Sequence, residues 1–303
     1  MILKALVLLE ELMSDDQNTR LDMKQLIVEV DGIPVSVWSA GDTGSDVVLL
    51  HGGGVDSALL SWREALPFLA QNHRVYAPDL PGYGETPFRK GTGSISFYLS
   101  FLDELLLVLG LPRVNLVGIS MGGSIALGYA LKNLSRVESL VLVDSYGLAN
   151  KAPAHFASWL TIKIPGLVNL SYAMMRKNRT MLRWSTRYLL GGPELLTNEI
   201  LDELAAAIGD PGAALAFSEF QLDELRVNGL KTCYMERLHE IHTPALIVHG
   251  SEDTLVPLKY AIEAVRRIPG AQLEVMEGAG HWPMRARPDQ FNLLLESFYS
   301  CQG

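Results

Sequence analysis

The segment "LVGISMGGSIAL" at residues 116–127 places Ser120 between two glycines in a G-x-S-x-G pattern. An apolar run precedes the serine and a helical pattern follows it, so Ser120 lies at a strand-to-helix corner. Gly118 and Gly122 fit such a corner because a Cβ at either position would clash with the neighbouring backbone. The corner would expose the serine hydroxyl above the N-terminus of the following helix. A tight turn can produce the same pattern by chance, so its meaning depends on partner residues.

A serine hydroxyl becomes a good nucleophile only with a base, an acid that orients the base, and donors for the developing oxyanion. His281, in "EGAGHWPMRARPDQF" after the last predicted strand, is the candidate base. Asp253, in "ALIVHGSEDTLVP", is the candidate acid, with Glu252 beside it and Asp144 at the end of "SLVLVD" as a rival. Capping of a helix or turn is the alternative role for either aspartate. The chain order serine, aspartate, histidine favours a triad of Ser120, Asp253 and His281.

The donors for an oxyanion are predicted in "LLHGGGVDS", where a strand ends in three glycines at 52–54. Glycines let backbone N–H groups face a substrate, and the Gly53 and Met121 amides would form the pair. A phosphate-binding turn is the alternative, but no Gly-Lys-Ser/Thr or dinucleotide spacing follows. The histidines of "HEIH" at 239–242 lack zinc-site spacing and a nearby third ligand. We therefore expect neither a metal nor a cofactor.

Strands alternating with helices predict an α/β protein with a mostly parallel sheet that is covered on both faces. The first two runs resemble a hairpin around "DG", and the later ones are continuous apolar runs. Helical patterns lie near 58–71, 95–110, 121–134, 257–268 and 288–299. The strand-like runs are 26–30, 33–40, 46–50, 74–79, 114–118, 139–144, 245–250 and 272–276.

The alternation stops between about 147 and 242, where only helical patterns occur. An all-helical insertion between two strands indicates a lid over the carboxyl edge of the sheet, where ligands bind. We therefore expect a core of 25–146 and 243–303 with a cap at 147–242. Residues 1–24 are predicted to form an amphipathic helix or extension, packed on the protein or on a second subunit.

Composition disfavours several partner classes. The 303 residues carry a formal charge of −9, which disfavours nucleic acid and anionic membranes. No apolar stretch is long enough to span a bilayer, so stable membrane insertion is not expected. Two cysteines, Cys233 and Cys301, favour a reducing, cytoplasmic location. The expected partner is a small-molecule substrate, and the chain could form a homodimer.

The segments "HGGG", "DLPGYGET", "GISMGG", "GSEDTLVP" and "GAGHWPMRARPDQF" resemble the serial landmarks of the α/β-hydrolase superfamily. The resemblance covers about 25–147 and 243–300, and the helical segment matches that family's cap. It implies a serine-nucleophile member with the cap inserted between strands 6 and 7. Serine at 120 disfavours the haloalkane dehalogenase and epoxide hydrolase branches, whose nucleophile is aspartate.

Within the superfamily, "HGGG", "SMGG" and "GHW" are similar to hydrolases that cleave meta-ring-fission products. Those enzymes usually have asparagine before the nucleophile, where this chain has Ile119, and use a cap arginine to hold an acidic diketone. An apolar cap and Ile119 favour instead a carboxylic ester with a hydrophobic part; C–C cleavage of a diketone, acyl transfer to another acceptor, and non-catalytic ligand binding are the alternatives. Gly54, Ile119 and Trp282 are candidate substrate-binding residues. The cap arginines are expected on solvated helix faces: Arg176, Arg179, Arg183, Arg187 and Arg226.

Overall fold

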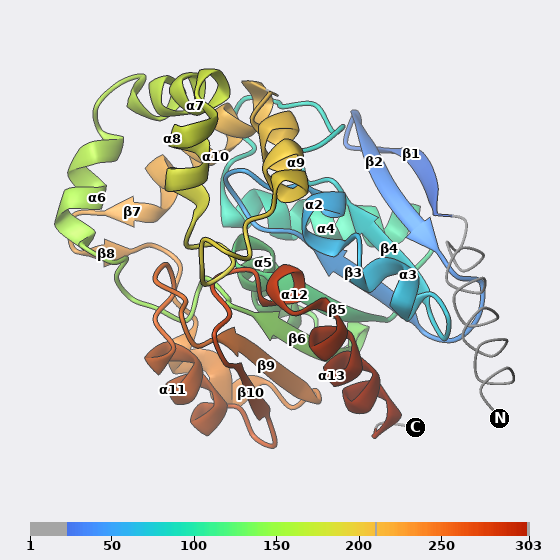
Figure 1. The fold of residues 1–303 in the computed structure, drawn as a ribbon. Coiled ribbons are helices and arrows are strands. Elements are labelled where there is room, and N and C mark those ends of the chain that lie inside the picture. Colours follow the sequence, from blue (N-terminus) through green and yellow to red (C-terminus); the bar gives the residue numbers. More distant parts are fainter. Residues whose placement is uncertain (1–22, 210, 302–303) are drawn as a thin grey trace, which may run out of the picture.

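A computed structural model describes residues 23–209 and 211–301. Their largest element is an eight-stranded sheet in the order β1-β2-β4-β3-β5-β6-β9-β10 (Figure 1). The first two pairings in this order are antiparallel and the others are parallel. The strands are β1 (Lys24–Val30), β2 (Ile33–Ala40), β3 (Asp46–Leu50), β4 (Arg74–Pro78), β5 (Val114–Ile119), β6 (Val137–Val143), β9 (Ala245–Gly250) and β10 (Gln272–Met276).

Helices cover both faces of this sheet and also form a separate group between β6 and β9. The helices of the core are α2 (Ala58–Trp62), α3 (Ala65–Leu69), α4 (Ile95–Val108), α5 (Met121–Lys132), α11 (Lys259–Arg267), α12 (Pro283–Ala286) and α13 (Pro288–Ser300), with a short 3₁₀ helix at Leu134–Arg136. The inserted group comprises α6 (His155–Ile162), α7 (Leu167–Lys177), α8 (Arg179–Thr186), α9 (Asn198–Gly209) and α10 (Pro211–Glu224), followed by a 3₁₀ helix at Met235–Glu240. We call the inserted segment between β6 and β9, residues 145–244, the cap.

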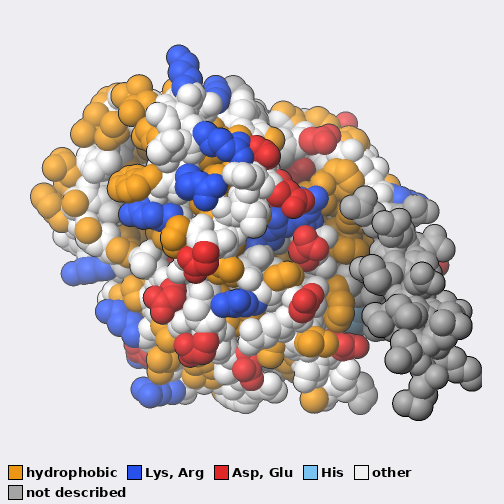
Figure 2. All heavy atoms as spheres, in the orientation of Figure 1, with side chains coloured by type: hydrophobic (Ala, Val, Ile, Leu, Met, Phe, Trp, Pro, Cys, Tyr) orange, Lys and Arg blue, Asp and Glu red, His pale blue; other side chains and the backbone are white. Residues whose placement is uncertain are grey.

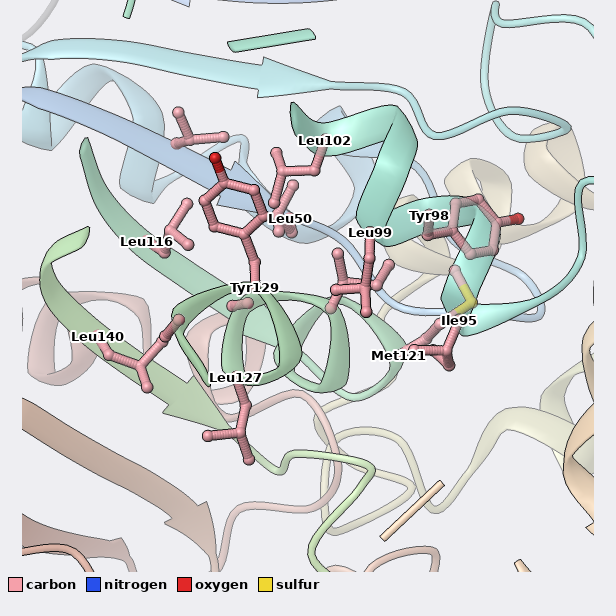
Figure 3. Packing of buried hydrophobic residues seen from close by; sticks show 14 of the residues in the cluster. Leu50, Ile95, Tyr98, Leu99, Leu102, Leu116, Met121, Leu127, Tyr129 and Leu140 are labelled. Carbon is pink, nitrogen blue, oxygen red and sulfur yellow. The ribbon is translucent and has the colours of Figure 1, made fainter. Parts of the chain in front are cut away.

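Two apolar clusters hold the layers together because successive strand residues point to opposite faces of the sheet. Val48 and Leu50 of β3 belong to one cluster with side chains of α4 and α5, and Val47 and Leu49 belong to the other with side chains of α2, α3 and α13. Figure 3 shows the first cluster, in which Tyr129 of α5 lies among leucines of the neighbouring strands and of α4. The burial of the inner parallel strands β3, β5, β6 and β9 on both faces explains their largely apolar sequences, whereas the edge strand β10 is partly exposed and includes Gln272 and Glu274.

The predicted α/β-hydrolase architecture is confirmed, and each of the eight predicted strands lies within two residues of an observed one. The hairpin turn between β1 and β2 has positive φ at Asp31 and Gly32, as a two-residue turn of this type requires. The cap differs slightly from the expected all-helical segment, since β7 (Leu225–Arg226) and β8 (Gly229–Leu230) form a small hairpin. The helix predicted for residues 1–24 lies outside the described residues except for its last two.

The topology brings the candidate residues to one edge of the sheet. The carboxyl ends of β3, β5, β9 and β10 lead directly into the loops that carry the glycines, Ser120, Asp253 and His281. Because parallel strands end at the same edge, residues far apart in sequence become neighbours there. Within residues 23–209 and 211–301, no helix is both long and apolar enough to cross a membrane.

Candidate active site

Ser120 lies at a strained corner between β5 and α5. Its φ of 51° and ψ of −117° are rarely adopted by residues with a side chain. The corner is held by the Ser120 N–H, which donates to Val143 O at 2.9 Å, and by the Tyr146 N–H, which donates to Ser120 O at 3.0 Å. A Cβ on Gly122 would lie 2.3 Å from Leu50 O, so the helix approaches β3 too closely for any other residue.

The glycine loop after β3 is oriented by His51, a residue whose role the sequence did not suggest. The Leu80 N–H donates to His51 Nε2 at 2.9 Å, so the proton lies on Nδ1 and is donated to Gly52 O at 2.7 Å. Burial lowers the pKa of His51 to about 4, which keeps the ring neutral. In a trans peptide the Gly52 carbonyl and the Gly53 N–H point in opposite directions. His51 therefore turns the Gly53 N–H away from the core.

Asp56 fixes the other side of the same loop. Its Oδ2 accepts the Gly52 N–H at 2.7 Å, and the Ser57 N–H and Ser61 hydroxyl also donate to this carboxyl group. Burial raises the pKa of Asp56 to about 7, although these hydrogen bonds oppose the shift. With the Gly52 N–H occupied, the next amide in the loop, that of Gly53, is the one left to face a ligand.

His281 and Asp253 form a direct pair, with 2.8 Å between Nδ1 and Oδ2. The other carboxylate oxygen of Asp253 accepts the Leu255 and Val256 N–H groups at 2.7 and 3.1 Å. Burial opposes ionisation of Asp253, but His281 and these donors outweigh it and lower its pKa to about 2. The carboxylate therefore holds the proton of His281 on Nδ1 and leaves Nε2 as an acceptor.

Asp144, the rival acid, occupies a different place in this network. It is fully buried, has a φ of 40°, and its Oδ1 accepts the Gly250 N–H at 3.1 Å. Burial and the nearby Asp253 carboxylate raise the pKa of Asp144 well above its usual range, which favours its neutral form. Its Oδ2 has no hydrogen-bond partner among the described residues. His281 is thus paired with Asp253 and not with Asp144.

Asp144, His249 and Asp253 have ligand-type atoms within 4.8 Å of one another, a spacing that a metal site could also show. Part of this set has protein partners, because Asp144 Oδ1 accepts the Gly250 N–H, whereas Asp144 Oδ2 and His249 Nδ1 have no hydrogen-bond partner among the described residues. His249 Nε2 lies 2.8 Å from Val256 O, and Asp253 is held by His281. We interpret the cluster as a hydrogen-bond network behind the histidine. The histidines of the "HEIH" segment are both exposed and lie outside it.

A cavity of about 330 Å³ lies between Ser120, the glycine loop and the cap. Its wall is mainly aromatic and aliphatic, and none of the described residues that line it is Lys or Arg. Met121, whose N–H has no partner inside α5 because it is the first helical residue, contributes to the wall beside Gly53. The lining residues are Gly52, Gly53, Gly54, Val55, Asp56, Ser120, Met121, Tyr146, Ser171, Tyr172, Met175, Met181, Ser185, Thr186, Tyr188, Leu189, Phe217, Phe220, Leu255, His281 and Trp282.

Of the three candidate substrate-binding residues, Gly54 and Trp282 line the cavity and Ile119 does not. Ile119 is wrong as a contact residue because it ends β5 with its side chain fully buried in the apolar cluster beneath Ser120. Ile119 therefore does not support the prediction of an ester substrate. The absence of asparagine there likewise leaves the described cavity wall unchanged.

The cap arginines are turned away from the cavity, as expected. Arg176 donates to Ile208 O, Arg183 donates to Leu196 O, and Arg187 lies over the Trp184 ring at 4.2 Å. Arg179 pairs with Asp202, and Arg226 pairs with Asp223. These contacts hold the guanidinium groups on the outer surface of the cap.

The sheet carries at one edge a serine at a strand-to-helix corner, a paired histidine and aspartate, and a glycine loop. This arrangement is typical of α/β hydrolases. The model of the alpha/beta hydrolase fold family matches residues 46–285, and the chain belongs to that family. It is 28% identical to the 2-hydroxy-6-oxo-2,4-heptadienoate hydrolase of Pseudomonas putida, over 89% of this chain and 94% of that protein. A 2-hydroxy-6-oxononadienedioate/2-hydroxy-6-oxononatrienedioate hydrolase of Dechloromonas aromatica is 30% identical, with 85% and 88% covered.

Solved structures give the same assignment. A meta-cleavage product hydrolase from Pseudomonas fluorescens superposes with a TM-score of 0.77 at 25% identity, covering 92% of this chain and 98% of its own. A serine hydrolase from the polyaromatic hydrocarbon-degrading bacterium Cycloclasticus zankles gives a TM-score of 0.73 at 26% identity, with the same two coverages. The similarity extends over the sheet and the cap together.

Proposed function

We propose that this protein is a serine hydrolase that cleaves a neutral carboxylic ester with a hydrophobic part. The observation that carries the proposal is the cavity above Ser120, whose described wall is mainly apolar and contains no Lys or Arg. A charged carboxylate in such a cavity would lose its hydration without gaining a Lys or Arg partner, whereas an apolar ester would lose little.

The chemistry follows from the arrangement of the site. His281 Nε2 removes the Ser120 proton as Oγ attacks the substrate carbonyl, and Asp253 stabilises the resulting imidazolium. The Gly53 and Met121 N–H groups bind the oxyanion. The protonated His281 then gives its proton to the leaving alcohol, and water repeats the attack on the acyl-enzyme with the same residues. No step requires a cofactor.

A second candidate is hydrolysis of a carbon–carbon bond in a 2-hydroxy-6-oxo-dienoate. The names of the relatives favour it, since several are hydrolases of such compounds. These substrates carry a carboxylate, for which the described cavity wall offers no Lys or Arg. Polar groups in the wall, such as the Ser185 and Tyr188 hydroxyls, would have to replace an ion pair. We rank this reaction second for that reason.

The two reactions are separated by measuring them side by side. We expect a burst of p-nitrophenol followed by steady turnover from p-nitrophenyl butyrate or octanoate. Ser120→Ala should abolish both phases, whereas Ser124→Ala, one helical turn away and outside the described cavity wall, should retain them. Loss of the 2-hydroxy-6-oxo-6-phenylhexa-2,4-dienoate chromophore, with no ester turnover, would replace the first proposal by the second. Binding of either compound without turnover would indicate a non-catalytic ligand-binding protein.

A further inference from the structure

The first half of the cap has a charge opposite to that of the whole chain. Residues 145–193 contain seven Lys and Arg residues and no Asp or Glu, while the complete chain has a net charge of −9. Of these seven side chains, Arg179 alone forms an ion pair with an acidic side chain among the described residues. The seven cations are Lys151, Lys163, Arg176, Lys177, Arg179, Arg183 and Arg187. The remaining residues therefore carry a net charge of −16.

The same segment also exposes large apolar side chains. Phe156 and Leu160 are one helical turn apart on α6, and Leu170 and Met174 are one turn apart on α7. Phe156 is 63% exposed and the other three are about half exposed. Ile164, which is exposed in the connection between the two helices, extends the apolar surface. We call these five side chains the cap face.

Neighbouring elements enlarge the cap face and its basic border. Leu222 of α10 and Ile164 line one shallow cavity of about 110 Å³. Trp184 of α8 is 65% exposed and lies beneath the Arg187 guanidinium. Figure 2 shows hydrophobic atoms gathered over α6 and α7 at the upper left, with Lys and Arg side chains close to them. Lys163 directly precedes Ile164 in this surface.

We propose that the cap face binds to an anionic lipid surface. Exposed aromatic and aliphatic side chains interspersed with cations are typical of helices that lie in a membrane interface. The apolar side chains enter the headgroup region, while lysines and arginines meet the lipid phosphates. This proposal departs from the expectation based on the charge of the whole chain, because a membrane interacts with the local charge of the face presented to it.

A second copy of the chain fits the cap face less well. A two-fold symmetric dimer through this face would bring cations such as Lys163, beside Ile164, against the same residues of the other copy. Pairing of the cap face with the acidic remainder of another copy would be a heterologous contact, which produces rings or open chains. A lipid surface satisfies the apolar and the positive groups at once without either difficulty.

The position of the cap face links it to the cavity above Ser120. The opposite side of α7 contributes Ser171, Tyr172 and Met175 to the cavity wall, while Leu170 and Met174 point outward. One helix thus separates the proposed lipid surface from the cavity. If the proposed function is correct, apolar esters dissolved in the lipid would be presented beside the cavity. Membrane binding itself does not depend on that function.

The test is flotation of the full chain with vesicles of phosphatidylcholine containing 30% phosphatidylglycerol, compared with phosphatidylcholine alone. We expect binding to the anionic vesicles that weakens as salt is raised. Lys163→Glu with Lys177→Glu should weaken it at least roughly thirtyfold, since each cation near an anionic surface strengthens binding about fivefold. Phe156→Ser with Leu160→Ser should weaken it at least about tenfold through lost apolar burial.

A matched control is Leu107→Ser with Lys132→Glu, an exposed apolar and an exposed basic residue on α4 and α5, outside the cap. This variant should bind as the unchanged chain does. Circular dichroism checks that each variant is folded. The rate of p-nitrophenol release from a p-nitrophenyl ester, measured without vesicles, checks that the cavity is intact. Absence of vesicle binding, or binding that the cap variants do not weaken, would overturn the proposal. Cap variants that only convert a dimer to monomers would assign the face to a second copy instead.

Discussion

The pairing of His281 with Asp253 leads to opposite expectations for two neighbouring aspartates. In Asp253→Asn, the new amide oxygen would keep the N–H groups of Leu255 and Val256, which donate to Oδ1 at 2.7 and 3.1 Å. The amide NH₂ would then face His281 Nδ1, replacing an acceptor at 2.8 Å by a donor. His281 would adopt the other tautomer, with its proton on Nε2, and could not deprotonate Ser120. We expect kcat to fall about 10⁴-fold.

Asp144→Asn is the matched control because it makes the same change on the adjacent carboxyl group. The raised pKa of Asp144 favours its neutral form, and an amide at this position keeps the acceptor for the Gly250 N–H. We expect kcat to stay within about threefold of the unchanged chain, because no hydrogen-bonding role is lost. The assay is ester turnover, supported by the rate at which an alkylphosphonofluoridate labels Ser120. Loss of activity in Asp144→Asn, with Asp253→Asn nearly unaffected, would refute this assignment and move the acid to the end of β6.

Three further substitutions test the scaffold of the site. Gly122→Ala should lower the free energy of unfolding by at least about 2 kcal/mol in urea titrations, because its Cβ would lie 2.3 Å from the Leu50 carbonyl oxygen; unchanged stability would contradict the close approach. His51→Leu should lower kcat about tenfold or more with little change in KM, since the Gly53 N–H loses its orientation; a change confined to KM would argue against this role. Because the pKa of Asp56 is about 7 in the folded protein, its carboxyl group ionises in the unfolded state at a lower pH than in the folded state. Its contribution to the free energy of unfolding should therefore fall by about 4 kcal/mol as pH rises from about 4 to about 8. Asp56→Asn should remove that part of the pH dependence, and an unaltered pH profile would show that Asp56 is charged in the folded protein.

The positions of the strands along the chain and the candidate triad could be predicted because both depend on local sequence patterns. Apolar runs of five to eight residues mark the strands, since a parallel strand is buried on both faces. Ser120, Asp253 and His281 each follow such a run, and the edge of the sheet brings them together. Their catalytic roles remain predictions that the substitutions above test.

The supporting residues could not be identified in this way. His51 and Asp56 both lie within "HGGGVDS", yet their roles depend on contacts with Leu80 and Ser61 that no local pattern reveals. A signal was present, because a histidine and an aspartate at the end of an apolar strand must find partners once they are buried. Asp144 illustrates the opposite difficulty. Its sequence context matched that of Asp253, and only the three-dimensional contacts show which carboxyl group reaches His281.

The residues of the cap that line the cavity could not be predicted from the sequence for a different reason, which α7 illustrates. A helix on the surface of a protein normally reveals its inner face because only one side is apolar. In "LVNLSYAMMRK" both sides are apolar: Tyr172 and Met175 are buried, whereas Leu170 and Met174 are exposed. Periodicity alone therefore cannot assign the residues that line the cavity. An outer face that stays apolar without a partner is unusual for a helix exposed only to water. The ambiguity that hid the cavity wall in the sequence is the feature that favours a second environment, a lipid surface, outside the cap.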